Sequence, residues 1–242
     1  MFDHVTIRVS DREASEDFYD QVLATIRIAK VNSEDWIAEW GVFSISPANE
    51  EKPATRGLHI GFAAPTRSHV DEFHRVGTEA GYRSDGEPGL RPEYGDDYYG
   101  SFLLDPDGNS VEAVHHDDLP SQSEIDHIWI RVSDLEASRR FYESLTPWSR
   151  FSVDTVTDDR VKFDGEGDVS FSVVAGKPTE SLHTAFPAND NSAVEAFHAA
   201  AIDFGFTDNG APGERPEYHD GYYGAFVLDP DGNNIEVVNH NR

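Results

Sequence analysis

The fold is decided by the stretch HVTIRVSD at residues 4–11, because a near copy, HIWIRVSD, follows at residues 127–134. In both copies apolar side chains alternate with polar ones, which is typical of a strand with one buried face. The Ser-Asp pair that ends each stretch supplies a side-chain oxygen suited to cap a helix N-terminus. The two stretches therefore predict the same strand and helix twice along the chain.

The repeat continues through the rest of both copies. Phe18-Tyr19 returns as Phe141-Tyr142, and the run LDPDGN at residues 104–109 returns at 228–233. The polar stretch between the copies is typical of a linker. We therefore predict a tandem duplication, with an N-terminal domain at 1–116, a linker at 117–123 and a C-terminal domain at 124–242.

Each copy begins with a strand, a helix and further strands. After the strand at residues 4–9, Ala14, Phe18 and Val22 form one apolar stripe of a helix. Two short strands are expected next, at residues 36–40 and 42–46.

The same order then starts again within the copy. Residues 58–62 alternate as a strand, and the following segment carries a helical stripe that includes Val70 and Phe73. A hairpin closes the unit, with strands at 98–104 and 110–114. Its connection, DPDGN, has a proline suited to the second position of a turn and a glycine free to adopt positive φ. Each copy is thus two βαβββ-like halves, and the chain holds four.

The absence of cysteine narrows the chemistry. No disulfide, thiolate ligand or cysteine nucleophile is available, so a metal site must use nitrogen and oxygen ligands. No apolar run approaches the roughly 20 residues of a membrane helix, and no basic leader precedes the first strand. We expect a cytoplasmic protein that does not interact with membranes.

Histidine and glutamate recur in register on the expected strands. His4 precedes an apolar set that faces the helix, His59 lies between Leu58 and Ile60, and Glu112 lies between two apolar neighbours. The second copy repeats the pattern with His127, His183 and Glu236. A single strand histidine is more often an ordinary hydrogen-bonded residue, but the recurrence of all three types in both copies favours ligation.

We therefore predict one metal site per copy, with His4, His59 and Glu112 in the first and the other three residues in the second. Two imidazoles and one carboxylate, with further positions left open, suit Fe²⁺, and Mn²⁺, Zn²⁺ or Ni²⁺ also bind such sets.

The same residues resemble the vicinal oxygen chelate superfamily, which holds glyoxalases, bleomycin-resistance proteins and extradiol dioxygenases. The resemblance lies in the opening His-x-x-Ile-x-Val-Ser-Asp, the Phe-Tyr pair, the mid-domain histidine strand and the ending Tyr-Tyr-Gly-x-Phe-x-Leu-Asp-Pro-Asp-Gly-Asn-x-x-Glu. It covers both copies almost end to end. It implies an α+β fold in which four βαβββ modules pair into two cup-shaped domains of antiparallel or mixed sheet. It also implies that the six residues bind divalent metals, which chelate two adjacent oxygens of a substrate.

Departures from the family patterns bear on the reaction. Lactoylglutathione lyases usually take a second carboxylate ligand from the last strand of the first half-domain, but residues 42–46 and 169–173 carry no acid there. In the extradiol dioxygenase motif, His219 and Glu236 fit, whereas Phe226 replaces a tyrosine. The first copy has Phe102 and Gly95 at the matching positions, so ring cleavage by the usual route is not expected, above all in the first copy.

Residues before and within the closing hairpin are candidates for binding substrate. They are aromatic or cationic and could orient a small anionic or aromatic molecule, although tyrosines are also ordinary sheet residues. This set comprises Arg91, Tyr94, Tyr98, Tyr99, Phe102, Arg215, Tyr218, Tyr222, Tyr223 and Phe226. His219 is the expected proton-transfer residue of the second copy, because imidazole is the side chain best suited to proton transfer at physiological pH, with a surface loop position as the alternative.

The sequence is compatible with two functions. The first is a metal-dependent lyase, isomerase or dioxygenase whose metal acts as a Lewis acid on a small substrate with vicinal oxygens. The alternative is a non-catalytic, drug-sequestering binder that needs no metal. Six intact ligands favour the enzyme, because a pure binder has no need of them. The partner in either case is a small molecule, and assembly into a homo-oligomer stays open.

The charge is strongly acidic, with 46 acidic against 19 basic residues and a formal net charge of −27. Such a surface repels phosphate, so we expect no nucleic-acid partner. Only four lysines are present. This lysine-poor, acid-rich composition is typical of proteins from salt-loving organisms, in which concentrated salt screens the self-repulsion.

On this halophilic interpretation, the melting temperature rises as potassium chloride is raised into the molar range, because screening weakens repulsion among the carboxylates. Thermal melts followed by circular dichroism measure it. A melting temperature that stays flat or falls with salt would show that the acidity serves another purpose.

Overall fold

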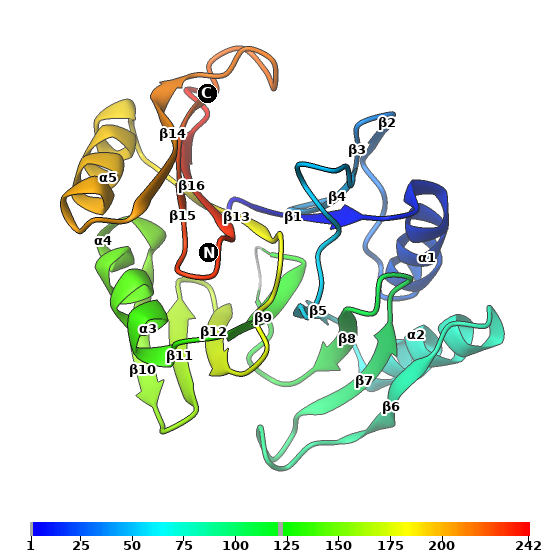
Figure 1. Ribbon diagram of the computed structural model, residues 1–242. Coiled ribbons are helices and arrows are strands. Elements are labelled where there is room, and N and C mark those ends of the chain that lie inside the picture. Colours follow the sequence, from blue (N-terminus) through cyan, green and yellow to red (C-terminus); the bar gives the residue numbers. More distant parts are fainter. Residues whose placement is uncertain (1, 121–122) are drawn as a thin grey trace.

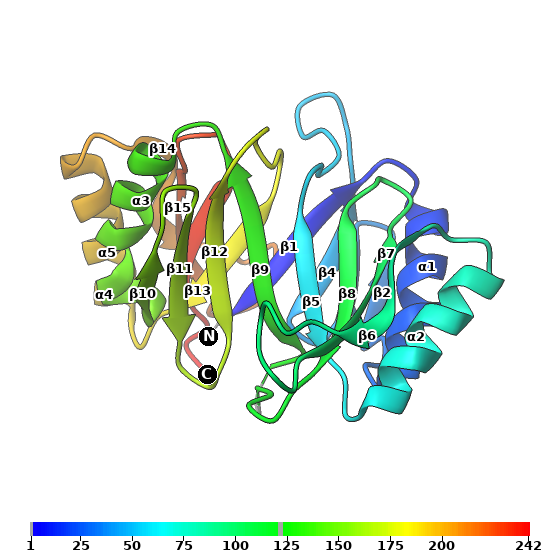
Figure 2. The ribbon, with the colours of Figure 1, turned by 90° about the horizontal axis from the view of Figure 1, so that it is seen from below.

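The computed structural model describes residues 2–120 and 123–242, so Met1 and two residues of the expected linker, Ser121 and Gln122, lie outside the described residues. It has an α+β fold with two eight-stranded mixed sheets. Helices α1 and α2 lie on one side of the molecule and α3 to α5 on the other, with the strands between them (Figures 1 and 2). The predicted fold class, four modules paired into two cup-shaped sheets, is confirmed.

The elements follow the predicted order in four modules. The first contains β1 (His4–Val9), α1 (Arg12–Thr25), β2 (Asn32–Glu34), β3 (Ile37–Trp40) and β4 (Phe43–Pro47). The second contains β5 (His59–Ala63), α2 (Arg67–Glu79), β6 (Ser84–Leu90), β7 (Tyr99–Leu104) and β8 (Ser110–His115). The third contains β9 (Ile125–Val132), α3 (Leu135–Ser144), α4 (Thr146–Ser149), β10 (Phe151–Val156), β11 (Arg160–Gly165) and β12 (Ser170–Ala175). The fourth contains β13 (His183–Pro187), α5 (Asn191–Asp203), β14 (Thr207–Glu214), β15 (Tyr223–Leu228) and β16 (Asn234–Asn239).

Each sheet joins one module from either copy. One sheet runs β14-β15-β16-β13-β1-β4-β3-β2 and combines the fourth module with the first. The other runs β10-β11-β12-β9-β5-β8-β7-β6 and combines the third with the second. The seams are antiparallel pairs, β1 with β13 and β9 with β5. The division at 1–116, 117–123 and 124–242 therefore describes the sequence repeat, and neither sheet belongs to a single copy.

The helix starts form as the sequence predicts. The Asp11 side chain accepts the N–H of Ala14 at 3.0 Å, and Asp134 accepts that of Ala137 at 2.9 Å. These caps satisfy amides that otherwise lack a partner in the first turn. Phe18 of the stripe that follows is buried, and its ring packs edge-on against that of Tyr82, with 4.8 Å between the centroids.

The outer strands of the modules differ most from the prediction. Strand β6 contains Gly86, Pro88 and Gly89, and it shows no apolar alternation. It pairs with β7 on one side only, and its register shifts twice. Proline and irregular pairing are tolerated at a sheet edge, where no second neighbour needs the backbone donors. Alternation therefore could not reveal this strand.

The repeated DPDGN turn connects three elements. Asp105 Oδ1 accepts the N–H groups of Asp107 and Asn109 at 2.9 and 2.8 Å, and its Oδ2 accepts the hydroxyl of Tyr19 on α1 at 2.9 Å. Asn109 Oδ1 accepts the N–H of Leu58, immediately before β5, at 3.2 Å. Gly108 has φ +85°, which a glycine adopts without strain. The turn thus fixes β5 and β8 relative to α1, and the second copy repeats it through Tyr142 and Asp229.

None of the helices in the described residues is long and apolar enough to cross a membrane.

Candidate metal centres

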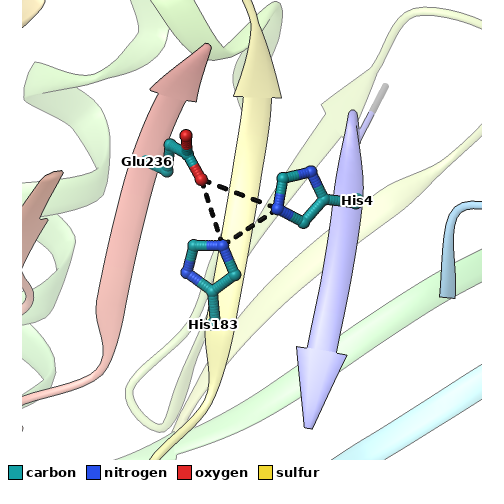
Figure 3. Close-up of side chains that lie close together, drawn as sticks. All are labelled: His4, His183 and Glu236. Atoms are coloured by element: carbon teal, nitrogen blue, oxygen red, sulfur yellow. Dashed lines mark hydrogen bonds and ion pairs between the residues drawn. The ribbon is translucent and has the colours of Figure 1, made fainter. Parts of the chain in front are cut away.

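The six expected ligands form two clusters in the structure. In the His4 centre, His4 of β1, His183 of β13 and Glu236 of β16 point toward one another (Figure 3). The two histidine Nε2 atoms are 3.0 Å apart, and Glu236 Oε2 lies 3.1 Å from His183 Nε2 and 3.6 Å from His4 Nε2. The register explains the convergence, because His4 and Glu236 both lie opposite Ala185 on neighbouring strands.

The His59 centre has the same design and is tighter. His59 of β5, Glu112 of β8 and His127 of β9 form it. The two Nε2 atoms are 3.0 Å apart, and Glu112 Oε2 lies 3.1 Å from His59 and 3.2 Å from His127. His127 and Glu112 lie opposite Gly61, where a Cβ would meet His127 Cε1 at 2.3 Å. The glycine lets this imidazole lie directly over the strand.

The prediction that each copy holds its own complete triad is wrong. His4 joins His183 and Glu236 of the second copy, and His127 joins His59 and Glu112 of the first. The cause is the seam, because β1 and β9 each pair with a strand of the opposite copy. The strand face of each ligand was predicted correctly, but β5 and β13 are repeats of one another. Alternation along β1 predicts which face of the strand is buried, but not whether the strand pairs with β5 or with β13.

The residues fit a divalent metal. Ligand atoms bonded at about 2.1 Å and at right angles to one another lie about 3.0 Å apart. The three edges of the His59 centre, 3.0, 3.1 and 3.2 Å, are close to this spacing. Three ligands on one face leave the opposite side free for other oxygens. This arrangement suits Fe²⁺ or Mn²⁺ as well as Zn²⁺ or Ni²⁺.

Each centre has a carboxylate behind its first-strand histidine. Asp3 Oδ1 lies 2.9 Å from His4 Nδ1, and Asp126 Oδ1 lies 2.6 Å from His127 Nδ1. Accepting the Nδ1 proton leaves the Nε2 lone pair directed at the centre, as in many metalloproteins. The sequence analysis missed these acids. The available signal was that an aspartate directly precedes the first histidine in both copies.

Tyrosine and glycine position the two glutamates. The hydroxyl of Tyr98 donates to Glu112 Oε1 at 2.9 Å, and that of Tyr222 donates to Glu236 Oε1 at 2.6 Å. A Cβ at Gly100 would lie 2.3 Å from Glu112 Oε1, so the glycine after each Tyr-Tyr pair leaves room for the carboxylate. One oxygen of each glutamate is thus held while the other faces the histidines.

The electrostatics of the two centres are alike. Burial lowers the pKa of His59 and of His183. Burial also acts to lower the pKa of His127, but its hydrogen bonds with Asp126 and Glu112 outweigh this and raise it to about 9. Burial also acts to lower the pKa of His4, but Asp3 and Glu236 outweigh this effect and raise that pKa above its ordinary value. One imidazole of each pair therefore favours the proton, and a divalent cation would take the place of that positive charge.

The sequence matches the family model of the Glyoxalase/Bleomycin resistance protein/Dioxygenase superfamily over residues 1–113 and 124–237. The chain belongs to this superfamily.

Solved structures agree in fold. Glyoxalase I from Zea mays is 20% identical, with a TM-score of 0.69 over 99% of this chain and 92% of its own. A putative dioxygenase from Bacillus subtilis is 13% identical, with a TM-score of 0.70 over 100% of this chain and 85% of its own. At these identities the likeness concerns the fold alone. The search of curated proteins gave no match.

A cavity of about 410 Å³ adjoins the His59 centre. Four of the residues expected to bind substrate line it: Arg91, Tyr94, Tyr98 and Phe102. Trp129 and Arg131 of β9 also line it, and the sequence analysis did not single them out. They lie two and four residues after His127, so strand alternation could have found them. Near the other centre, Arg215 lies over Phe226 at 5.5 Å, and the rings of Tyr218 and Tyr222 are 4.9 Å apart.

Two expected substrate-binding residues lie elsewhere. The hydroxyl of Tyr99 donates to Asp71 of α2 at 2.7 Å, and that of Tyr223 donates to Glu195 of α5 at 3.0 Å. Both therefore lie on the helix-covered face of their sheet. The cause is strand alternation, which places the second tyrosine of each Tyr-Tyr pair opposite to the first.

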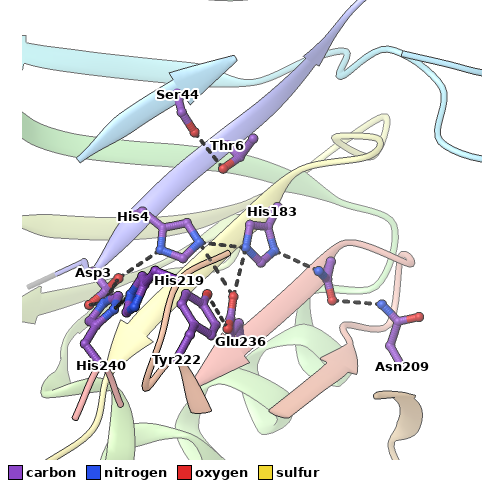
Figure 4. A network of polar contacts seen from close by, with 11 residues as sticks. Asp3, His4, Thr6, Ser44, His183, Asn209, His219, Tyr222, Glu236 and His240 are labelled. Carbon is purple, nitrogen blue, oxygen red and sulfur yellow. Dashed lines mark hydrogen bonds and ion pairs between the residues drawn. The ribbon is translucent and has the colours of Figure 1, made fainter. Parts of the chain in front are cut away.

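His219 is joined to the His4 centre indirectly. Its Nε2 lies 2.8 Å from Nδ1 of His240, whose Nε2 lies 3.0 Å from Asp3 Oδ2 (Figure 4). Asp3 in turn contacts His4. In the His59 centre, His116 Nε2 lies 2.8 Å from Asp126 Oδ2, just as His240 contacts Asp3 in the other centre. Gly95, however, stands at the position equivalent to His219. The role of His219 in proton transfer stays a prediction.

We expect the metal content to follow the cross-copy triads. The variant His4→Ala/Glu236→Ala loses one of two equivalents, since both changes empty one centre, whereas His4→Ala/Glu112→Ala loses both. Elemental analysis of protein purified without chelators gives the metal-to-chain ratio. One equivalent retained by His4→Ala/Glu112→Ala, with its near-UV circular dichroism unchanged, would place the triads within single copies.

Proposed function

We propose that this protein is a divalent-metal-dependent enzyme of its superfamily that acts on a small substrate with two adjacent oxygens. The observation that carries the proposal is the pair of His-His-Glu centres, each with its ligand atoms already gathered. His4, His183 and Glu236 would hold one metal, and His59, Glu112 and His127 the other. When bound, the metal supplies Lewis acidity to a substrate carbonyl or hydroxyl pair. The candidates remain Fe²⁺, Mn²⁺, Ni²⁺ and Zn²⁺.

The surrounding side chains have distinct tasks in this proposal. Asp3 and Asp126 fix the tautomer and the ring orientation of the histidines they contact. Burial beside Glu112 raises the pKa of Tyr98, so its phenol stays protonated and holds the glutamate as a donor. Burial beside Glu236 raises the pKa of Tyr222 in the same way, so neither tyrosine hydroxyl is a general base. In the His4 centre, the path through His240 could carry a proton between His219 and the ligand shell.

The ligand count bears on the type of reaction. A glyoxalase-type lyase would draw a second carboxylate from β4 or β12. Ser44 and Ser172 lie on these strands, beside Thr6 and Trp129 of the neighbouring strands. Neither serine can replace an anionic ligand. This supports chemistry with three protein ligands, in which the substrate provides the remaining oxygens.

The alternative remains a binder that uses the aromatic cavity beside Trp129 without metal. The buried charges favour the enzyme. Glu112 and Glu236 are each about 1% exposed and face imidazoles, an arrangement that is costly to bury unless it serves to hold a cation.

Water-proton relaxation of the Mn²⁺-loaded protein tests this proposal. Catechol, added without oxygen, should lower the relaxation enhancement, because its two adjacent hydroxyls displace metal-bound water. Phenol, with one hydroxyl, should lower it much less. The variant Glu112→Ala/Glu236→Ala controls for loosely bound Mn²⁺. An enhancement that catechol leaves unchanged would contradict the proposal.

A further inference from the structure

The two cups, meaning the concave sheet faces that carry the His4 and His59 centres, differ in one wall. The wall of the His4 cup continues from His183 through Thr6 and Ser44 to Glu39, which lie opposite one another on successive strands. The matching row of the His59 cup runs from His59 to Trp129, Ser172 and Lys162. These rows occupy equivalent places in the two sheets.

The row of the His59 cup has a cationic and aromatic character. Arg160 lies two residues before Lys162, so strand alternation places both on the same face of β11. The guanidinium of Arg160 lies over the ring of Trp129, 4.3 Å from its centroid, and its Nε donates to Ser172 Oγ at 3.1 Å. At this distance the cation and the indole attract one another. Trp129 is therefore held in place as a wall of the cavity.

The guanidiniums of Arg131 and Arg160 lack an acidic partner, and that of Arg91, which lines the same cavity, donates to the backbone oxygens of Leu90 and Glu87. Arg131 lines the cavity and donates to the backbone oxygen of Gly57 at 3.2 Å, and Arg160 donates to a serine hydroxyl. Neither forms an ion pair with a carboxylate within residues 2–120 and 123–242. Lys162, by contrast, pairs with Asp154 and Asp164. Asp85, Glu93 and Glu112 line the same cavity, but none of them lies within ion-pair distance of the guanidiniums of Arg131 and Arg160, whose N–H donors are therefore available to an external anion.

The His4 cup lacks these features. Thr6 stands in place of Trp129, and its hydroxyl bonds that of Ser44 at 2.8 Å. Glu39 stands in place of Lys162 and accepts from Asn32 at 2.8 Å. Arg8 is the counterpart of Arg131 in the repeat. The wall of the His4 cup therefore has one arginine in common with that of the His59 cup, and it has the carboxylate of Glu39 in addition. Glu236 has its counterpart in Glu112 of the other cup, so Glu39 is the carboxylate that this wall adds against an anionic ligand.

We propose that the His59 cup is specific for a planar organic anion, with the anionic group toward Arg131 and Arg160 and the flat body against Trp129, and that the His4 cup does not share this preference. The inference rests on the proposed function, because two adjacent oxygens of the same molecule would face the metal. The cavity of about 410 Å³ is in the range that holds small ligands. The two cups therefore serve different substrates.

Calorimetric titration of the zinc-loaded protein tests this, with 3,4-dihydroxybenzoate and catechol as probes. Both offer adjacent oxygens, but only the first carries a carboxylate. Zinc is redox-inactive, so no turnover interferes. We expect 3,4-dihydroxybenzoate to bind one site per chain at least about tenfold more tightly than catechol, as a charge-assisted pair predicts. The variant Arg131→Gln/Arg160→Gln should lose that preference and keep its zinc.

Matched variants separate the outcomes. Arg140→Gln removes an exposed positive charge on α3 and should leave the preference unchanged, and Arg8→Gln tests the other cup. Zinc-dependent binding of both probes with equal affinity would overturn the inference while the proposed function stands. A preference that survives in Arg131→Gln/Arg160→Gln, or that disappears in Arg8→Gln instead, would also overturn it. If neither probe binds in a zinc-dependent way, the proposed function fails and the inference fails with it.

Discussion

The antiparallel pairing of β1 with β13, and of β9 with β5, assembles both candidate metal centres. Each seam joins the sheet of a module from one copy to that of a module from the other copy. It thereby places a histidine of one copy beside a histidine and a glutamate of the other copy. Because side chains alternate along a strand, the register of the seam decides whether those ligands meet inside the cup or lie on the helix side. A slip of one residue would turn His4 away from His183. The seam is thus the structural condition for both centres.

The centres also impose a cost that the fold must offset. Each places a buried glutamate, two imidazoles and a neighbouring aspartate in a small volume. Such a set is stable only when nearly all of its hydrogen bonds are made, which Tyr98, Tyr222, Asp3 and Asp126 accomplish. The DPDGN turns hold the strands that carry these residues. The hydroxyls of Tyr19 and Tyr142 join the first helix of each copy to those turns.

Much of this could be predicted from the sequence. The alternation in HVTIRVSD and HIWIRVSD predicted the strands and their faces, and recurrence singled out six residues that the structure gathers into two clusters. The assignment of ligands to centres could not be predicted, since repeated strands such as β5 and β13 offer the same pattern to β1. The edge strands β6 and β14 carry glycine and proline in place of an apolar face. The wall formed by Trp129 and Arg160 depends on contacts between strands that only the sheet order reveals.

The cross-copy assembly of the metal centres is tested most directly by an anomalous-diffraction map of crystals of the zinc-loaded protein, collected just above the zinc absorption edge. We expect two peaks in each chain. One should lie within bonding distance of His4, His183 and Glu236, and the other within bonding distance of His59, Glu112 and His127. A peak bound by His4, His59 and Glu112, or zinc found only at surface carboxylates, would contradict it.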